Sequence, residues 1–431
     1  MPAKPSYRPR LVTYLIPIGL FVLVAAIALL LVRGYSFDPK TGGLQKTGLI
    51  VLDSTPKNAF VTINRTVEPE RTRSTFKLAP GTYDVKVDMP DVHPWQQQIR
   101  LEPGEAVLEE NVLLFKAKPG QKALTSGAVP GQALSPSGKE LAFLNPTATG
   151  VALSTIPTTH PEAGRAATNL PAGYAAPRSL SWSDDGSQLV VSAGNETRLV
   201  TASDGRTVTL GVGGRAAVAP QQSDAVIVEP EPGRLVRATS GAGAAVEPYE
   251  TDVTAWVASG GTIYVARTDG TVVKRNGPTD RKVVSEKHSL TSLTAAGADR
   301  VFGQDADGTV YLIANDGLKA VVTDAERYVV SRDGDQIAYL KQRELRLWDQ
   351  HDGTDTLLTR FTESPEQLAI VPGGHYVLYG RAGELHVIAA DGTNDTELST
   401  GVDLSEVINR EHVLVRSRAT GRSTALTILD R

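Results

Sequence analysis

Hydrophobic and polar positions divide the chain into three parts. No charged residue occurs from Leu11 to Val32, a run of 22 residues that would be about 33 Å long as a helix. From Gly48 to Phe115, apolar residues come in short runs separated by turns that contain Ser, Pro and Gly. The same strand-like pattern then returns at a regular spacing and continues to Leu429. We therefore expect one N-terminal helix followed by an all-β chain.

The uncharged run matches the thickness of a lipid bilayer. Lys4, Arg8 and Arg10 precede it without any acidic residue, and such positive segments stay in the cytoplasm. We therefore expect a cytoplasmic tail at 1–10, a transmembrane helix at 11–32 that contacts lipid, and extracytoplasmic domains after it. A cleaved signal peptide is the alternative, because Ala26-Ile27-Ala28 has the small-x-small form of a cleavage site. The apolar run continues to Val32, beyond that site, and this favours an uncleaved anchor.

A Gly-rich polar linker is expected at 33–46, followed by a domain of short strands at 47–116. The expected strands are 48–52, 59–63, 74–78, 83–87, 95–101 and 107–115. No helical period is visible between them, so the pattern predicts a small antiparallel β-sandwich of about 70 residues.

The motifs of this segment resemble the PEGA domain family. The resemblance rests on a strand that ends in Ser54-Thr55-Pro56, on Ala59-Phe60-Val61 and on Pro80-Gly81-Thr82-Tyr83-Asp84-Val85, in that order. Asn58 stands where the family has Gly, and Asn tolerates a positive φ. Arg65-Thr66 replaces the family's usual turn Gly. The resemblance covers about a sixth of the chain and implies a non-catalytic module of envelope and surface proteins.

The remaining part of the chain repeats a unit of about 37 residues. Two rows of turn residues keep this period. The first row is Gly138, Gly186, Ser223, Gly260, Gly297, Gly334, Gly373 and Asn409, and the second is Gly205, Gly241, Gly277, Gly317, Gly353 and Gly392. Each unit holds four short strands, as in 328–359. Four strands in a unit of this length predict a blade of a β-propeller, because such a sheet buries both faces only by stacking on its neighbours.

We expect eight blades over 117–431, with seven as the alternative. The last unit ends before its fourth strand, whereas 121–125 resembles the fourth strands of other units. The N-terminal strand is therefore expected to complete the last blade and close the ring. The motifs Leu134-Ser135-Pro136-Ser137-Gly138 and Trp182-Ser183-Asp184-Asp185-Gly186 resemble the blades of TolB-like and WD-like propellers. This resemblance implies a propeller that binds other proteins.

Composition excludes several functions. The chain has no cysteine, which rules out disulfides, Cys-ligated zinc, iron–sulfur clusters and thiol nucleophiles. Its formal charge is −4, and without the first four basic residues about −8 remains on the part expected outside the cell. No long basic run occurs, so a nucleic-acid partner is not expected.

No catalytic, cofactor-binding or metal-ligating residue is predicted, and the ligand-binding residues are left open. The seven histidines, at 93, 160, 288, 351, 375, 386 and 412, form no H-E-x-x-H pair, and surface or turn positions are the favoured interpretation. Asp305-Ala306-Asp307-Gly308-Thr309 fits a fragment of a calcium loop, but a hairpin turn is favoured. A hairpin turn is also favoured for Gly211-Val212-Gly213-Gly214 over a phosphate loop. Trp182, Trp256 and Trp348 could stack on a sugar or quinone, but packing between blades is favoured.

The sequence thus predicts a non-catalytic, single-pass membrane protein of the cell envelope. Its propeller would bind an envelope protein or polysaccharide. Two alternatives stay open. One is a propeller enzyme, either a quinone-type oxidoreductase or a glycan lyase, and the other is a structural component of a surface layer.

Overall fold

The computed structural model describes residues 8–32, 35–38, 43–128, 130–158, 164–219, 222, 224–240, 244–277, 281–285, 288–297, 300–314 and 317–430. Most of the expected cytoplasmic tail (1–7), His160, Ser223 and Gly241 lie outside these ranges. The chain separates into two compact units, Met1–Phe115 and Lys116–Asp430.

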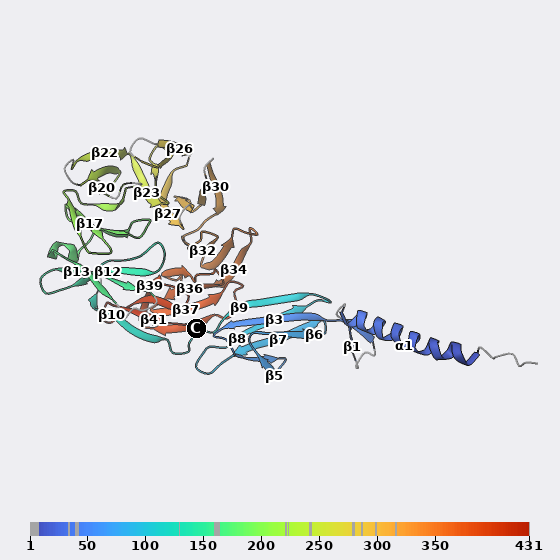
Figure 1. The fold of residues 1–431 in the computed structure, drawn as a ribbon. Coiled ribbons are helices and arrows are strands. Elements are labelled where there is room, and N and C mark those ends of the chain that lie inside the picture. Colours follow the sequence, from blue (N-terminus) through green and yellow to red (C-terminus); the bar gives the residue numbers. More distant parts are fainter. Residues whose placement is uncertain are drawn as a thin grey trace, which may run out of the picture. The chain divides into compact units, whose positions relative to one another are not determined.

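The helix of the first unit is α1 (Arg8–Val32), 25 residues long (Figure 1). Its side chains are described from Leu15 to Leu29, and the large hydrophobic ones among them are 49% to 73% exposed. Within the described residues, no helix combines the length and the apolar character that crossing a membrane requires. The span expected at 11–32 is therefore not confirmed and stays a prediction.

The expected linker at 33–46 contains a two-stranded hairpin. Strands β1 (Tyr35–Asp38) and β2 (Gly43–Lys46) pair antiparallel, from Tyr35 opposite Lys46 to Asp38 opposite Gly43. The role of 33–46 as a linker stays a prediction, and its described residues form paired strands. The Tyr-Ser-Phe sequence that starts β1 alternates aromatic and polar residues, a pattern that suits a strand.

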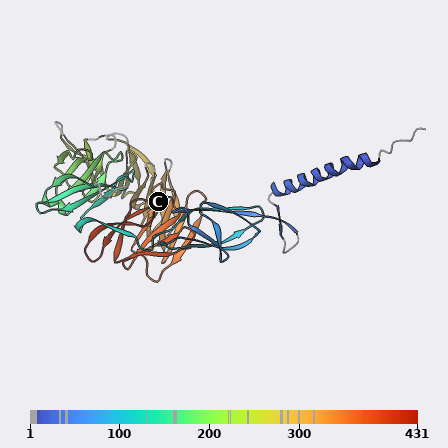
Figure 2. The ribbon, with the colours of Figure 1, turned by 60° about the horizontal axis from the view of Figure 1, so that its bottom comes forward.

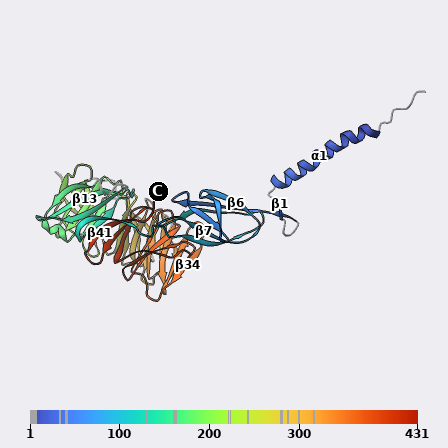
Figure 3. The same ribbon diagram turned by 90° about the horizontal axis from the view of Figure 1, so that it is seen from below.

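Two sheets form the sandwich of the first unit (Figure 3). One has the order β6-β3-β9, and the other has the order β5-β4-β7-β8. The strands are β3 (Gly48–Thr55), β4 (Phe60–Ile63), β5 (Thr66–Arg71), β6 (Ser74–Leu78), β7 (Gly81–Asp88), β8 (Trp95–Leu101) and β9 (Ala106–Leu113). All six expected strands are present, and β5 is an additional one.

The sandwich departs from the expected antiparallel arrangement at one pair. Strands β3 and β9 run parallel, with Leu49 opposite Ala106 and Thr55 opposite Leu113. Before β9, the chain passes through the other sheet, where β7 and β8 form a hairpin. It then returns to the first sheet as β9, which lies beside β3 and runs in the same direction. A parallel pair needs such a crossover, which local strand patterns do not specify.

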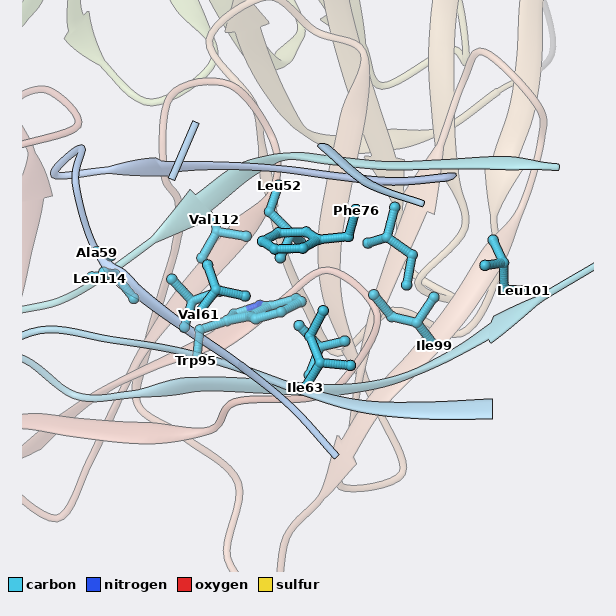
Figure 4. Packing of buried hydrophobic residues seen from close by; sticks show 13 residues of the cluster. Leu52, Ala59, Val61, Ile63, Phe76, Trp95, Ile99, Leu101, Val112 and Leu114 are labelled. Atoms are coloured by element: carbon cyan, nitrogen blue, oxygen red, sulfur yellow. The ribbon is translucent and has the colours of Figure 1, made fainter. Parts of the chain in front are cut away.

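The core of the sandwich lies between the two sheets (Figure 4). Leu52 from one sheet and Val61 from the other are fully buried, and Trp95 and Phe76 are at least 94% buried. Alternate residues of β3 point into this core, as expected for a strand with one face on a core. Asn58 has φ of 65°, the left-handed conformation expected where it replaces Gly.

The second unit is a ring of eight four-stranded antiparallel sheets, so the propeller expected from the repeat is confirmed (Figure 2). We number its sheets as blades 1 to 8. Blade 1 contains β11 (Gln132–Leu134), β12 (Glu140–Pro146), β13 (Val151–Pro157) and β14 (Arg165–Leu170); blade 2 contains β15 (Ser179–Trp182), β16 (Gln188–Ala193), β17 (Glu196–Thr201) and β18 (Thr207–Leu210); blade 3 contains β19 (Arg215–Val218), β20 (Ala225–Glu231), β21 (Arg234–Thr239) and β22 (Val246–Thr251); blade 4 contains β23 (Val253–Ser259), β24 (Thr262–Arg267), β25 (Val272–Arg275) and β26 (Arg281–Ser285). A short 3-10 helix, η2 (Ala172–Ala175), joins blades 1 and 2.

The other four blades follow the same plan. Blade 5 contains β27 (Leu290–Ala296), β28 (Arg300–Asp305), β29 (Val310–Ala314) and β30 (Gly317–Val322); blade 6 contains β31 (Arg327–Val330), β32 (Gln336–Lys341), β33 (Glu344–Asp349) and β34 (Asp355–Arg360); blade 7 contains β35 (Gln367–Ile370), β36 (Tyr376–Arg381), β37 (Glu384–Ala389) and β38 (Thr396–Thr400); blade 8 contains β39 (Val402–Val407), β40 (His412–Ser417), β41 (Arg422–Thr427) and β10 (Gly120–Ala128).

Blade 8 closes the ring with strands from both ends of the unit. Strand β10 pairs antiparallel with β41, from Gly120 opposite Thr427 to Ala123 opposite Thr424. The two strands lie side by side in Figure 1. The expected completion of the last blade by the N-terminal strand is therefore confirmed.

Neighbouring blades share hydrophobic cores. The second strand of a blade is buried on both faces, as Ile337 to Leu340 of β32 show. Among the described residues, seven hydrophobic clusters each join two adjacent blades, and residues of β35, β36 and β37 contact β39 at the interface of blades 7 and 8. A single blade would leave these faces in water, so the closed ring is the unit of stability.

Candidate functional site at the channel mouth

The centre of the propeller opens into a cavity of about 710 Å³. First strands of neighbouring blades contact one another, as β11 with β15 and β31 with β35 do, so these strands surround the axis. The cavity lies where they end. We call it the channel mouth, and its lining residues are Leu134–Ser137, Asp184, Gly260, Ala295–Gly297, Val329–Arg332, Leu368–Ile370, Pro372 and Ser405–Val407.

Two exposed, opposite charges occupy the same turn position in different blades. The turns Trp182-Ser183-Asp184-Asp185-Gly186 and Val330-Ser331-Arg332-Asp333-Gly334 align residue for residue, which places Asp184 in blade 2 and Arg332 in blade 6. Three blades lie between them on each side of the ring of eight, so they belong to opposite sides of the axis. Pro136 and Pro372 hold the same position in blades 1 and 7, where the turn carries no charge.

Both charged side chains reach beyond their own blade. Asp184 accepts a hydrogen bond from the backbone N–H of Gly261 in blade 4. The guanidinium of Arg332 lies against the turn of blade 1, because a Cβ added at Gly138 would overlap it. A second cavity of about 320 Å³, lined by residues of blades 2, 3 and 4, also includes Asp184. The polar edge of the mouth is thus built from turns of several blades.

Glu406 adds a half-buried carboxyl group to the channel mouth. The register of β39 against β40 shifts between Leu404 and Glu406, which is the pairing irregularity of a β-bulge. A bulge changes the direction of the side chains beside it. Burial raises the pKa of Glu406 to about 7, and the positive charge of Arg332 acts in the opposite direction. Glu406 therefore changes its charge near neutral pH.

The structure places the three tryptophans of the blade strands in cores. Trp182, Trp256 and Trp348 are at least 91% buried, each in a cluster shared by two blades. Trp182 donates from Nε1 to the backbone oxygen of Ala133 in blade 1 at 2.9 Å. Trp256 donates to Glu229 Oε2 in blade 3 at 2.8 Å. The prediction of packing between blades is confirmed.

The segment considered as a calcium loop is a hairpin turn. Asp305 Oδ1 accepts hydrogen bonds from the backbone N–H groups of Asp307 and Thr309 at 3.1 and 2.8 Å. The carboxylate is thus used within the turn, as favoured from the sequence.

Gly211 to Gly214 do not form the hairpin turn expected from the sequence. They connect the fourth strand of blade 2 to the first strand of blade 3. A Cβ added at Gly213 or Gly214 would overlap backbone atoms of Gly194 or Glu229, which explains why these positions lack a side chain. No helix follows, so the phosphate-loop geometry is absent from these residues.

One histidine differs from its expected surface role. His386 lies with Glu384 and Glu397 in blade 7, and one possible ligand atom from each residue lies within 4.8 Å of the others. This group, which could hold a metal ion, was not predicted from the sequence. The spacing Glu384-Leu385-His386 was an available signal, because residues two apart share one face of a strand. Glu406 and Arg332 were also missed, because only the closed ring brings them to the same cavity.

Comparisons with known proteins found similarity to solved structures at low sequence identity. No family model and no curated protein sequence matches the chain. The WD40 domain of SCAP from fission yeast is similar at 9% identity with a TM-score of 0.48, over 72% of this chain and 94% of that one. An oligogalacturonate lyase in complex with manganese is similar at 14% identity with a TM-score of 0.44, over 73% and 99%. BamB from Moraxella catarrhalis is similar at 15% identity with a TM-score of 0.44, over 66% and 95%. The propeller architecture itself rests on the blade topology described above.

Proposed function

We propose that this chain is a single-pass membrane protein of the cell envelope that binds another protein at the channel mouth of its extracytoplasmic propeller. The observation that supports the proposal most is the composition of the channel mouth. It combines apolar side chains such as Leu368 and Val407 with exposed charges of both signs, Asp184 and Arg332. An apolar centre with charged groups at its edge is the composition of a protein-binding surface.

The proposed membrane anchor is the segment 11–32. Its large apolar side chains, where described, are mostly exposed along α1, and water is a poor environment for such a surface. Lys4, Arg8 and Arg10 support an N-terminus in the cytoplasm and the later residues outside it. The PEGA-like motifs of 47–116 agree with a module of the envelope. In this proposal the propeller of 117–431 is the binding domain.

The chain lacks cysteine, which makes its topology directly measurable. The variants Ser6→Cys and Ser137→Cys each carry a single thiol, one before the anchor and one at the channel mouth. A membrane-impermeant maleimide should label Ser137→Cys in intact cells, and Ser6→Cys only after the cells are opened. Labelling of both variants, or of neither, before opening would contradict the proposed topology.

Binding at the mouth is tested with the variant Arg332→Glu. A partner held at the mouth should be recovered with the native chain and lost with this variant. Lys319→Glu is the matched control, because it makes the same change in charge at an exposed position on the outer strand of blade 5. This variant should retain the partner. Recovery of a polysaccharide would change the class of ligand. Recovery of further copies of this chain alone would favour a surface-layer component.

A glycan lyase is the second candidate, and the observation that favours it is Glu406 with Arg332 at the channel mouth. In a lyase that acts on uronate units, a cation neutralises the sugar carboxylate while a base removes the neighbouring proton. The bond from C4 to the leaving oxygen then breaks, a C4–C5 double bond forms, and the leaving oxygen takes a proton from water. A glutamate with a pKa of about 7 suits the role of the base.

The product of that elimination absorbs ultraviolet light, so the candidate is easily tested with polygalacturonate. Activity that disappears in Glu406→Gln and persists in Glu363→Gln, a control on an exposed loop, would establish a lyase. Absence of the absorbing product with the native chain would leave the binding function alone.

A further inference from the structure

Blade 7 brings three metal-binding side chains together away from the channel mouth. Glu384 and His386 lie on β37, and Glu397 lies on β38. Glu384 and His386 share a face of the strand because two positions separate them. Glu397 is the register partner of His386 on the neighbouring strand. This pairing explains why possible ligand atoms of all three residues lie within 4.8 Å of one another.

The imidazole of His386 is held in place from a third strand. Tyr379 on β36 stacks on it, with ring centroids 5.0 Å apart and planes 9° from parallel. The Tyr379 hydroxyl donates to the carboxylate of Asp395, with distances of 2.8 and 2.7 Å to its two oxygens. Asp395 Oδ1 in turn lies 3.5 Å from His386 Nδ1. A carboxylate beside one ring nitrogen orients the other toward a metal in many metalloproteins.

The other ring nitrogen lies near a carboxylate but makes no hydrogen bond among the described residues. His386 Nε2 is buried and has no hydrogen-bond partner among the described residues. Glu384 Oε2 lies 3.5 Å from it. A buried polar atom left unpaired costs free energy, whereas a bound cation would satisfy both the nitrogen and the carboxylate. His386 Nε2 and the carboxylates of Glu384 and Glu397 therefore have the arrangement of a set of metal ligands.

We propose that Glu384, His386 and Glu397 bind one divalent transition-metal ion, with Zn²⁺ as the best fit. The ligands are His386 Nε2 and one carboxylate oxygen of each glutamate, and water completes the coordination. The glutamates must move inward to reach zinc–ligand distances of about 2.0 to 2.2 Å. Their exposure permits this, because the Glu384 side chain is 41% exposed and Glu397 is also exposed. An imidazole ligand favours Zn²⁺ over Ca²⁺ and Mg²⁺, which bind through oxygen.

The bound ion would join the third and fourth strands of blade 7. It binds the folded chain and not the unfolded one, so it should raise the melting temperature. Arg381 lies 3.9 Å from Glu384 Oε2 and competes weakly for that carboxylate.

Calorimetric titration of the full chain in detergent, cleared of metal with EDTA and then titrated with ZnCl₂, tests the proposal. We expect one strong site per chain and a higher melting temperature with zinc. Glu397→Gln changes an exposed side chain and should weaken binding at least tenfold. Asp395→Asn, which alters a positioning residue, should weaken it by about 10- to 100-fold. His386→Gln should abolish the strong site.

His351→Gln is the matched control. His351 also lies beside a carboxylate, at 3.4 Å from Asp335, but its ring is 76% exposed. This variant should bind zinc as the native chain does. The proposal is overturned if the native chain shows no strong site, or if Glu397→Gln and Asp395→Asn, folded as judged by their melting temperatures in EDTA, bind zinc as tightly as the native chain.

Discussion

The backbone N–H of Ser423 donates a hydrogen bond to the hydroxyl of Thr125 at 3.0 Å, although 298 positions separate the two residues. Both residues are at least 95% buried. The bond lies where the regular pairing of β10 with β41 is interrupted between Ala123 and Ala128. A side chain thus replaces a backbone acceptor at the closure of the ring.

Thr125→Val tests the importance of this bond. Valine keeps the shape of threonine but leaves the buried N–H of Ser423 without its acceptor, at a cost of about 1 to 3 kcal/mol. We expect a lower denaturant midpoint for the full chain in detergent. Thr209→Val, on the exposed fourth strand of blade 2, is the control and should change the midpoint little. Equal midpoints for the two variants would show that the closure does not depend on Thr125.

Glu406 gives the stability of the propeller a defined pH dependence. An unfolded glutamate ionises near pH 4.5, whereas folded Glu406 keeps its proton to about pH 7. Between these values the unfolded chain releases its proton first, so stability falls as the pH rises through this window and levels off above it.

Glu406→Gln removes this component of the pH dependence. The variant and the native chain should melt at similar temperatures at pH 3, where the carboxyl is neutral in both states. At pH 8 the variant should melt at the higher temperature, since the native chain then holds a half-buried charge. Melting curves of both proteins across this pH range test the expectation. A difference in melting temperature that stays constant at all pH values would contradict the raised pKa of Glu406.

Trp256 couples blades 3 and 4 through Glu229. Trp256→Phe keeps most of the packing but removes the donor that Glu229 Oε2 accepts from at 2.8 Å. We expect a loss of about 1 to 3 kcal/mol, because the carboxylate is left without this partner. A double-mutant cycle with Glu229→Leu measures the coupling. Strictly additive effects of the two changes would mean that the bond contributes nothing.

The proposed anchor predicts a specific response to charge. Arginine at the centre of a membrane-spanning helix costs about 2.5 to 3.5 kcal/mol per residue. The triple variant Leu20→Arg, Leu23→Arg and Ile27→Arg should therefore move the chain from the membrane fraction to the soluble one. The triple alanine variant at the same positions is the control and should stay with the membrane. Retention of the arginine variant in alkali-washed membranes would argue against an anchor at 11–32.

The repeat made the propeller predictable from sequence. Glycines in tight turns, such as Gly334 with φ of 79°, mark the ends of strands, and their spacing reveals the blade. The resemblance of 121–125 to a fourth strand was enough to predict the closure. The turn glycines and the strand-like segment are local features, so they can be recognised in a single sequence.

The site residues were not predictable in the same way. Glu406 gains its raised pKa from burial in the closed ring, and Arg332 approaches it from two blades away. His386 meets Glu397 only through the register of β37 and β38. The parallel pairing of β3 and β9 likewise follows from the path between two sheets. Each of these contacts joins residues of different strands, and the local sequence pattern does not predict which strands come together.

Photo-crosslinking in intact cells tests whether the channel mouth binds another protein. A photoreactive amino acid at Ser137 lies at the channel mouth, and one at Ala320 lies on the exposed outer strand of blade 5. We expect a discrete adduct with another protein from position 137, which is lost when Arg332 is changed to Glu, and no such adduct from position 320. Equal adducts from both positions, or a mouth adduct that Arg332→Glu leaves unchanged, would contradict binding at the channel mouth.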